Sequence, residues 1–132
     1  MVTTPLDVHG TDHSSFGTTN SGYKESTAFA QAFDVALPLP VGASIVQYSF
    51  RYYGAHPNTG NLSSKIVTIV DDVEIDSATS TIPPVLQSWQ RWIRFGFPPV
   101  VVAEDVRYVL RFTAGGPAIR VSAPTVGWLP AP

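Results

Sequence analysis

The stretch QSWQRWIRFGFPPVVVAEDVRYVLRF, residues 87–112, decides the fold class. Apolar and polar side chains alternate in both halves, and a period of two is typical of strands with one buried face. We predict two strands, over residues 89–97 and 106–113. The alternation turns one set of side chains toward the core: Ile93, Phe95, Phe97, Val106, Tyr108, Leu110 and Phe112. It turns the other set outward: Trp92, Arg94, Arg107 and Arg111.

The rest of the chain repeats this pattern of short strands between Pro- and Gly-containing turns. Further strands are predicted over residues 28–37, 44–54, 62–70, 73–79, 118–122 and 126–129. Asp71 and Asp72 form a predicted two-residue hairpin turn. About eight strands without a helical period favour an all-β, eight-stranded antiparallel jelly-roll-like β-sandwich. We place this single domain at residues 26–132.

Length and composition exclude several classes of protein. The 132 residues fit one domain with its own core, and the absence of cysteine excludes disulfides and thiolate metal sites. A net charge of −2 without charge runs argues against nucleic acid as a partner. No apolar run is long enough for a membrane span. The N-terminus has neither a basic n-region nor an apolar h-region, which predicts no signal peptide.

Residues 1–25 form a predicted polar N-terminal arm, rich in Gly, Ser, Thr and Asn. The segment is either a frayed terminus or an arm that orders on a partner. Its apolar side chains are the candidate contacts: Leu6, Val8, Phe16 and Tyr23.

The order AQAFDVALPLPVGASIVQYSFRYYG followed by SWQRWIRFGFPPVVVAEDVRYVLRF resembles jelly-roll domains of carbohydrate-binding modules and of phage virion proteins. The resemblance covers residues 28–112 and implies a fold more than a function. It rests on core and corner positions: Phe33, Asp34, Pro40, Gly42, Ile45, Trp89, Phe95, Phe97, Val100, Ala103, Tyr108 and Leu110. Glu104-Asp105 stands where a corner glycine is usual, so we expect a different turn there.

The sequence predicts no catalytic site and no cofactor. No serine lies in a G-x-S-x-G elbow, and no Gly-rich phosphate loop precedes a helix. His9, Asp12 and His13 form a string that could supply metal ligands, but it lies in the polar arm. A weak calcium candidate is the acidic hairpin of Asp71, Asp72, Glu74 and Asp76, although turn chemistry and solvation also explain these residues.

The predicted outer face carries the candidate interface: Gln47, Arg51, Tyr53, Trp92, Arg94, Arg107 and Arg111. Trp, Tyr and Arg are enriched at interface hot spots, although arginine stems also cover isolated exposed rings. Our first hypothesis is a non-catalytic virion structural protein of a tailed bacteriophage, a capsid decoration (cement) protein or a tail or fibre component. It would be a dimer or trimer, contact other virion proteins such as the major capsid protein, and be made in the host cytoplasm.

The alternative hypothesis is a carbohydrate-binding module, for example one for host attachment. Trp92 or Tyr53 would stack on a pyranose ring, and Arg94 or Gln47 would bind its hydroxyls. The two hypotheses differ in whether Trp92 is buried between subunits or bare on the surface.

Overall fold

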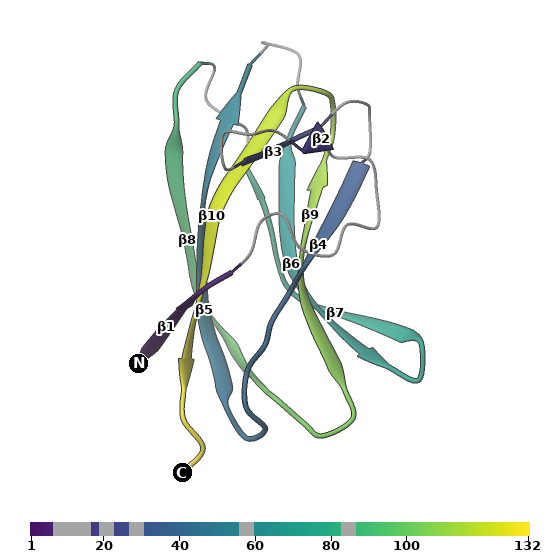
Figure 1. Cartoon of the computed structure of the whole chain (residues 1–132), viewed down its shortest axis with the longest axis vertical. Coiled ribbons are helices and arrows are strands. Elements are labelled where there is room, and N and C mark those ends of the chain that lie inside the picture. The colour runs from purple at the N-terminus through teal and green to yellow at the C-terminus, as the bar shows by residue number, and fades with distance from the viewer. Residues whose placement is uncertain (7–16, 19–22, 27–30, 56–59, 83–86) are drawn as a thin grey trace.

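The computed structural model describes residues 1–6, 17–18, 23–26, 31–55, 60–82 and 87–132. These residues form two antiparallel sheets packed face to face, with no helix among them (Figure 1). Accordingly, the described part of the chain contains no helix long and apolar enough to cross a membrane. The prediction of an all-β antiparallel sandwich is confirmed.

The first sheet, sheet A, runs in the order β2-β3-β10-β5-β8, with β1 also paired to β10. Its strands are β1 (Val2–Pro5), β2 (Gly17–Thr18), β3 (Tyr23–Glu25), β5 (Ser44–Gly54), β8 (Gln90–Val101) and β10 (Ile119–Leu129). The second, sheet B, runs β4-β9-β6-β7. Its strands are β4 (Gln31–Ala36), β6 (Leu62–Val70), β7 (Val73–Ile82) and β9 (Arg107–Ala114).

The described strands number ten rather than eight. Three of them, β1 to β3, come from the segment predicted as an arm, and β1 and β3 pair with β10. The strands predicted over residues 118–122 and 126–129 are one strand, β10, whose register shifts between Ser122 and Thr125. In its described parts, the N-terminal segment is therefore built into sheet A.

The core lies between the sheets, and aromatic rings from both sheets meet in it. On β5 the alternation predicted from sequence buries Tyr48, Phe50 and Tyr52. Phe50 meets Phe112 of sheet B edge to face, with ring centroids 4.9 Å apart. The Tyr48 hydroxyl reaches the Ser64 hydroxyl of β6 at 2.9 Å, so a hydrogen bond also joins the two sheets.

Strand β8 corrects the orientation predicted for its first half. Trp92 packs against the core, while Ile93 and Phe95 are 43% and 66% exposed. Gly96 has a φ of +77°, and beyond it Phe97 is buried as predicted. A residue with positive φ interrupts the strict alternation, as at a bulge, so the side chains before Gly96 point to the opposite faces from those expected.

The predicted hairpin turn is confirmed, because β6 and β7 pair directly on either side of Asp71 and Asp72. Both aspartates have positive φ, 49° and 64°, which is the signature of a type I′ turn. The turn before β9 likewise holds Asp105 at a φ of 61°.

Candidate functional site

Three aromatic side chains meet on the outer face of sheet A, and we call them the aromatic cluster: Tyr23, Tyr53 and Trp89. Tyr23 belongs to β3, Tyr53 to β5, and Trp89 directly precedes β8. The Trp89 ring centroid lies 5.3 Å from that of Tyr53 and 5.7 Å from that of Tyr23. All three side chains are half-buried, so each also keeps surface open to solvent.

Arg120 of β10 is fixed within this cluster. Its guanidinium lies 4.8 Å from the centroid of Tyr53 and 5.1 Å from that of Tyr23. It donates a hydrogen bond of 2.6 Å to the carboxylate of Glu25. That bond is the main reason why the pKa of Arg120 lies above its ordinary value. The ion pair and the stacked cation hold the two tyrosines at a defined spacing.

Two more arginines extend the cluster toward the edge strand. Arg51 of β5 places its guanidinium 5.4 Å from the centroid of Trp89. Arg91 of β8 lies directly opposite Arg51 in the strand register, and both are exposed. Next to them, the Ser49 hydroxyl lies 2.6 Å from that of Thr125 on β10.

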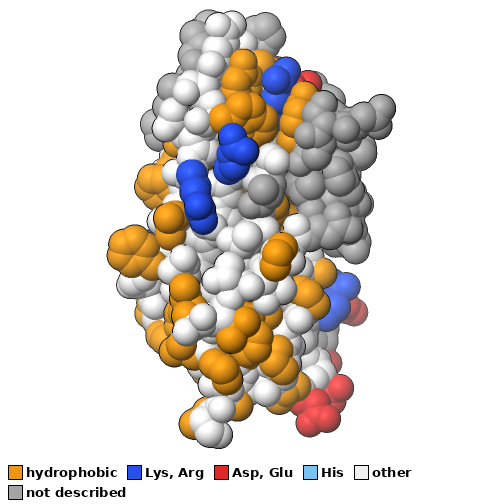
Figure 2. Space-filling model, turned by 60° about the vertical axis from the view of Figure 1, so that its left-hand side comes forward, with side chains coloured by type: hydrophobic (Ala, Val, Ile, Leu, Met, Phe, Trp, Pro, Cys, Tyr) orange, Lys and Arg blue, Asp and Glu red, His pale blue; other side chains and the backbone are white. Residues whose placement is uncertain are grey.

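This face of the molecule is divided along its length. Figure 2 shows Lys and Arg side chains beside hydrophobic ones over the upper half, and several separate hydrophobic patches, with charged side chains along one edge, over the lower half. Exposed apolar residues of β8, Ile93 and Phe95, belong to the outward side of the same sheet. Gln47 of β5 pairs in register with Phe95 and is half-buried. It lies away from Tyr53 along β5 and therefore outside the aromatic cluster.

The aromatic cluster and its arginines have the chemistry of a platform for a ring-shaped polar ligand. Aromatic faces accept the apolar side of such a ring, and arginine forks donate hydrogen bonds to its oxygens. Ligand sites of this kind combine apolar walls with a few convergent polar groups.

The structure gathers only two of the predicted interface residues, Arg51 and Tyr53, at the aromatic cluster. Trp92 and Arg94 were expected to point outward, and the structure turns both inward. The Arg94 guanidinium lies 5.9 Å from the ring centroid of the core residue Phe97. Arg107 and Arg111 belong to β9 and therefore to the other sheet. The predicted set is thus not one surface.

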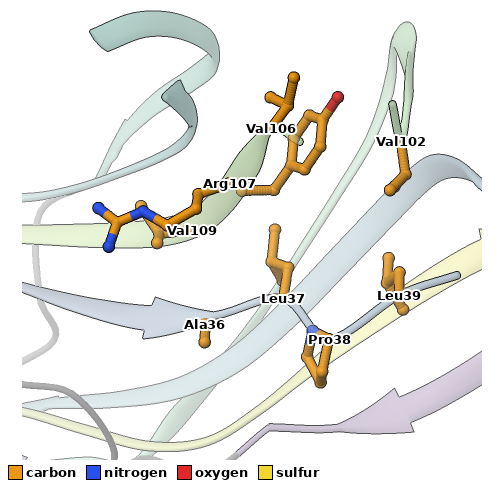
Figure 3. Close-up of a pocket in the computed structure, with 9 residues that line it drawn as sticks. Ala36, Leu37, Pro38, Leu39, Val102, Val106, Arg107 and Val109 are labelled. Carbon is orange, nitrogen blue, oxygen red and sulfur yellow. The ribbon is translucent and has the colours of Figure 1, made fainter. Parts of the chain in front are cut away.

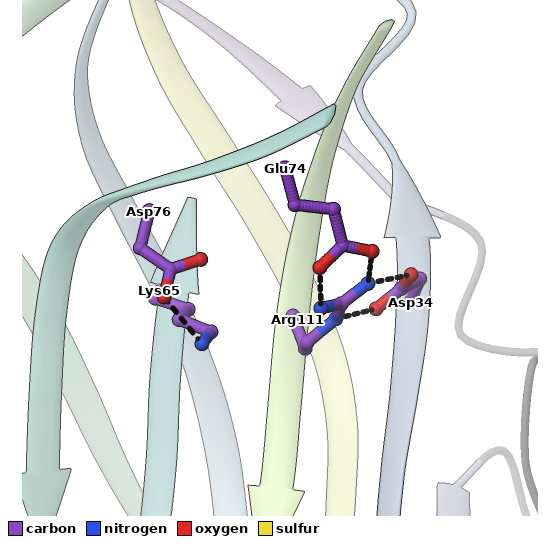
Figure 4. Close-up of polar contacts among 5 residues, drawn as sticks. All are labelled: Asp34, Lys65, Glu74, Asp76 and Arg111. Carbon is purple, nitrogen blue, oxygen red and sulfur yellow. Dashed lines mark hydrogen bonds and ion pairs between the residues drawn. The ribbon is translucent and has the colours of Figure 1, made fainter. Parts of the chain in front are cut away.

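Arg111 is engaged within the molecule instead of facing a partner (Figure 4). It bonds both carboxylate oxygens of Asp34, at 2.7 and 2.9 Å, and both of Glu74, at 2.6 and 2.9 Å. These bonds raise its pKa above the ordinary value, with the hydrogen bond to Asp34 as the largest cause. Arg111 is therefore a structural link across β4, β9 and β7.

The acidic hairpin proposed as a weak calcium candidate is also engaged internally. Glu74 binds Arg111, and Asp76 binds Lys65 at 2.8 Å. Asp71 and Asp72 form the turn. Within the described ranges, no group of three or more His, Asp or Glu side chains is placed to hold a metal ion. The string of His9, Asp12 and His13 lies outside those ranges.

The candidate arm contacts separate into different environments. Leu6 is buried in the core of its own chain, so it is not exposed to a partner. Tyr23 belongs to the aromatic cluster. Val8 and Phe16 lie outside the described residues. The contributions of Tyr23, Trp89 and Arg120 to one surface were missed, because pairing of β3 with β10 brings together residues about a hundred positions apart.

A separate pocket of about 280 Å³ opens at one end of sheet B (Figure 3). Residues 36–39 and 106–109 line it together with Val102. Arg107, one of the predicted interface residues, is the charged residue among the described residues of its lining. The hydroxyl of Tyr108 is already engaged, since it accepts a hydrogen bond from the Ala103 amide and donates one to the Val101 carbonyl.

Comparison with known proteins gives a fold likeness only. No protein-family model matches the sequence, and no curated protein sequence matches it. Among solved structures, the C-terminal CBM6 of LamC, a marine laminarinase from Zobellia galactanivorans, is similar with a TM-score of 0.53 and 11% identity. The match covers 95% of this chain and 98% of that one.

Two larger enzyme chains also match. The isomalto-dextranase of Arthrobacter globiformis T6, solved with panose, matches with a TM-score of 0.48 and 13% identity, over 80% of this chain and 21% of its own. The GH26-CBM35 β-(1,4)-mannanase of Podospora anserina matches with a TM-score of 0.49 and 15% identity, over 99% of this chain and 28% of its own. This chain therefore spans between about a fifth and somewhat more than a quarter of those enzymes.

The likeness to the CBM6 domain places this chain among β-sandwiches of that architecture. It agrees with the carbohydrate-binding part of the resemblance found in the sequence. It gives no support to the virion part.

Proposed function

We propose that this protein is a non-catalytic carbohydrate-binding domain, and that it binds glycan on the outer face of sheet A. The observation that carries the proposal is the aromatic cluster, in which Tyr53 and Trp89 lie 5.3 Å apart with Arg51 and Arg120 against their faces. The CBM6-like fold supports the same function.

Binding would divide between rings and polar groups. The apolar face of a sugar ring would cover the open parts of Trp89 and Tyr53, which removes apolar surface from water. Arginine guanidinium groups and the hydroxyl of the half-buried Thr125 would meet the sugar oxygens. The rings are already packed against one another and against cations, so little side-chain entropy would be lost on binding.

A glycan panel followed by titration calorimetry tests the proposal. Trp89→Ala should weaken binding of the selected glycan at least about tenfold, because one aromatic contact contributes on the order of 1 kcal/mol beyond its buried area. Phe95→Ala is the matched control, since it removes an exposed ring from the same face outside the cluster. Equal effects of the two substitutions, or no glycan bound by the wild type, would refute the proposal.

A further inference from the structure

We infer that the glycan bound at the aromatic cluster is anionic, and that Arg51 and Arg91 hold its carboxylate or sulfate group. This inference rests on the proposed function and specifies the class of ligand. It follows from how the two arginines are placed and from what the structure leaves around them.

Arg51 and Arg91 are a directly opposed cross-strand pair on β5 and β8. Opposed side chains on one face of an antiparallel pair have Cβ atoms about 5 Å apart, and like charges there are destabilising. A carboxylate opposite one of these arginines would give a favourable cross-strand pair instead. An anion between the two guanidinium groups would replace their repulsion with two attractions.

Neither arginine is paired with a carboxylate in the described part of the chain. Arg51 contacts the Trp89 ring, and Arg91 makes one long contact of 3.5 Å to the Ser49 hydroxyl. By contrast, Arg111 and Arg120 each bond a carboxylate of the same chain, at 2.6–2.9 Å. The Arg51–Arg91 pair thus keeps its donor groups available for an external oxyanion.

The local charge also opposes that of the whole chain. The chain carries a net charge of −2. Yet among the described residues the cluster and its extension hold three arginines, Arg51, Arg91 and Arg120, against one carboxylate, that of Glu25, a local net charge of +2. Such a local field attracts an acidic polymer without making the whole protein a polycation.

The position of the pair relative to the rings fits an acidic sugar. Arg51 lies against Trp89 on one side and opposite Arg91 on the other. A sugar ring stacked on Trp89 would therefore bring a charged substituent to the pair. The half-buried Thr125, whose hydroxyl is bonded to that of the buried Ser49, would supply a further polar contact.

The experiment compares acidic polysaccharides with neutral counterparts by titration calorimetry. Polygalacturonate against its methyl ester tests carboxylate, and dextran sulfate against dextran tests sulfate. We expect acidic forms to bind at least about tenfold more tightly than neutral ones, since a hydrogen bond to an ionised group is roughly twice as strong as one between neutral groups. The preferred acidic polymer identifies which anion is recognised.

Arg91→Gln and Arg51→Gln should each reduce this preference roughly tenfold. Arg107→Gln is the matched control, because it removes the same charge from an exposed arginine of sheet B. If all three variants lose affinity equally, the preference is a general charge effect and the inference is wrong.

The remaining outcomes separate this inference from the proposed function. Binding of neutral polymers as tight as that of acidic ones, lost in Trp89→Ala, keeps the proposed function and overturns the anionic ligand. If the protein binds neither pair of polysaccharides and no glycan of the panel, both the proposed function and the anionic ligand are overturned. Acidic binding lost in Arg91→Gln and in Trp89→Ala supports both.

Discussion

Arg111 and Asp34 face each other across β9 and β4, and two hydrogen bonds of 2.7 and 2.9 Å join the guanidinium to the carboxylate. The Asp34 side chain is only 2% exposed, whereas Glu74, the other carboxylate on Arg111, is 47% exposed. A carboxylate this deeply buried is tolerated only when its charge is balanced and its oxygens are bonded. The ion pair of Arg111 with Asp34 therefore matters more for stability than its ion pair with Glu74.

Removal of the arginine should destabilise the fold strongly. Arg111→Ala leaves the Asp34 carboxylate buried without its guanidinium, and we expect a loss of about 3 kcal/mol in the free energy of unfolding. Urea denaturation followed by fluorescence measures it. Glu74→Ala is the control and should cost under about 1 kcal/mol, because that pair is open to solvent. Equal losses of unfolding free energy in both variants would contradict the greater contribution of the Asp34 pair.

The two neighbouring tryptophans should have opposite roles. Trp92→Ala removes a ring packed against the core and should lower the free energy of unfolding by about 2 kcal/mol or more. Trp89→Ala should change stability by less and instead weaken glycan binding. Unfolding curves and calorimetry on the same two variants test both statements. A stable Trp92→Ala protein would indicate that β8 has its other face toward the core.

Alkaline pH should destabilise the protein through Tyr48. Burial raises the pKa of its hydroxyl above 10.0. The folded state therefore keeps the proton longer than the unfolded chain does. This contribution is complete below the unfolded pKa and is lost as the pH rises through the folded one.

Tyr48→Phe should therefore show a shallower fall of stability than the wild type above about pH 10. Ser64→Ala is the complementary variant, because the hydrogen bond between Tyr48 and Ser64 lowers the pKa of Tyr48. That variant should retain or steepen the alkaline fall. Urea unfolding at a series of alkaline pH values decides between these slopes, and an unchanged slope in Tyr48→Phe would refute the role of Tyr48.

The β6–β7 turn offers a stabilising substitution. Asp72 has a φ of 64°, a conformation that glycine adopts without strain. Asp72→Gly should raise the free energy of unfolding by about 0.5 kcal/mol. Thr68→Gly, in a regularly paired part of β6, should lower it by roughly 0.5–1 kcal/mol. A melting temperature that falls in both variants would show that the turn does not limit stability.

The fold class could be predicted because alternation of side chains carries it. The bounds of β5 and β6 agree with the predicted ranges, since their apolar faces repeat every second residue and turn residues end them. The first half of β8 could not be predicted by the same rule. The prediction assigned inward and outward side chains by counting back from Phe97, but Gly96 interrupts the alternation before it. An isolated glycine within a strand is the one sequence signal that indicates such an interruption.

The candidate site was predictable only in part. Tyr53 and Arg51 followed from the alternation of β5. Trp89 precedes its strand, and the family resemblance suggested a core or corner role for it instead. Tyr23 and Arg120 joined the site through β3–β10 pairing, which depends on which distant strands become neighbours. Local periodicity contains no information about that order.

The pairing of Val2 with Trp128 brings the two chain ends together, and Figure 1 shows both at one end of the sandwich. The aromatic cluster lies toward the opposite end of β10, since Arg120 and Trp128 are separated by about 25 Å of extended strand. A fluorescent reporter or an immobilising tag at either terminus would therefore lie away from the aromatic cluster. Sensor-chip and microarray formats suit this protein in both orientations of attachment.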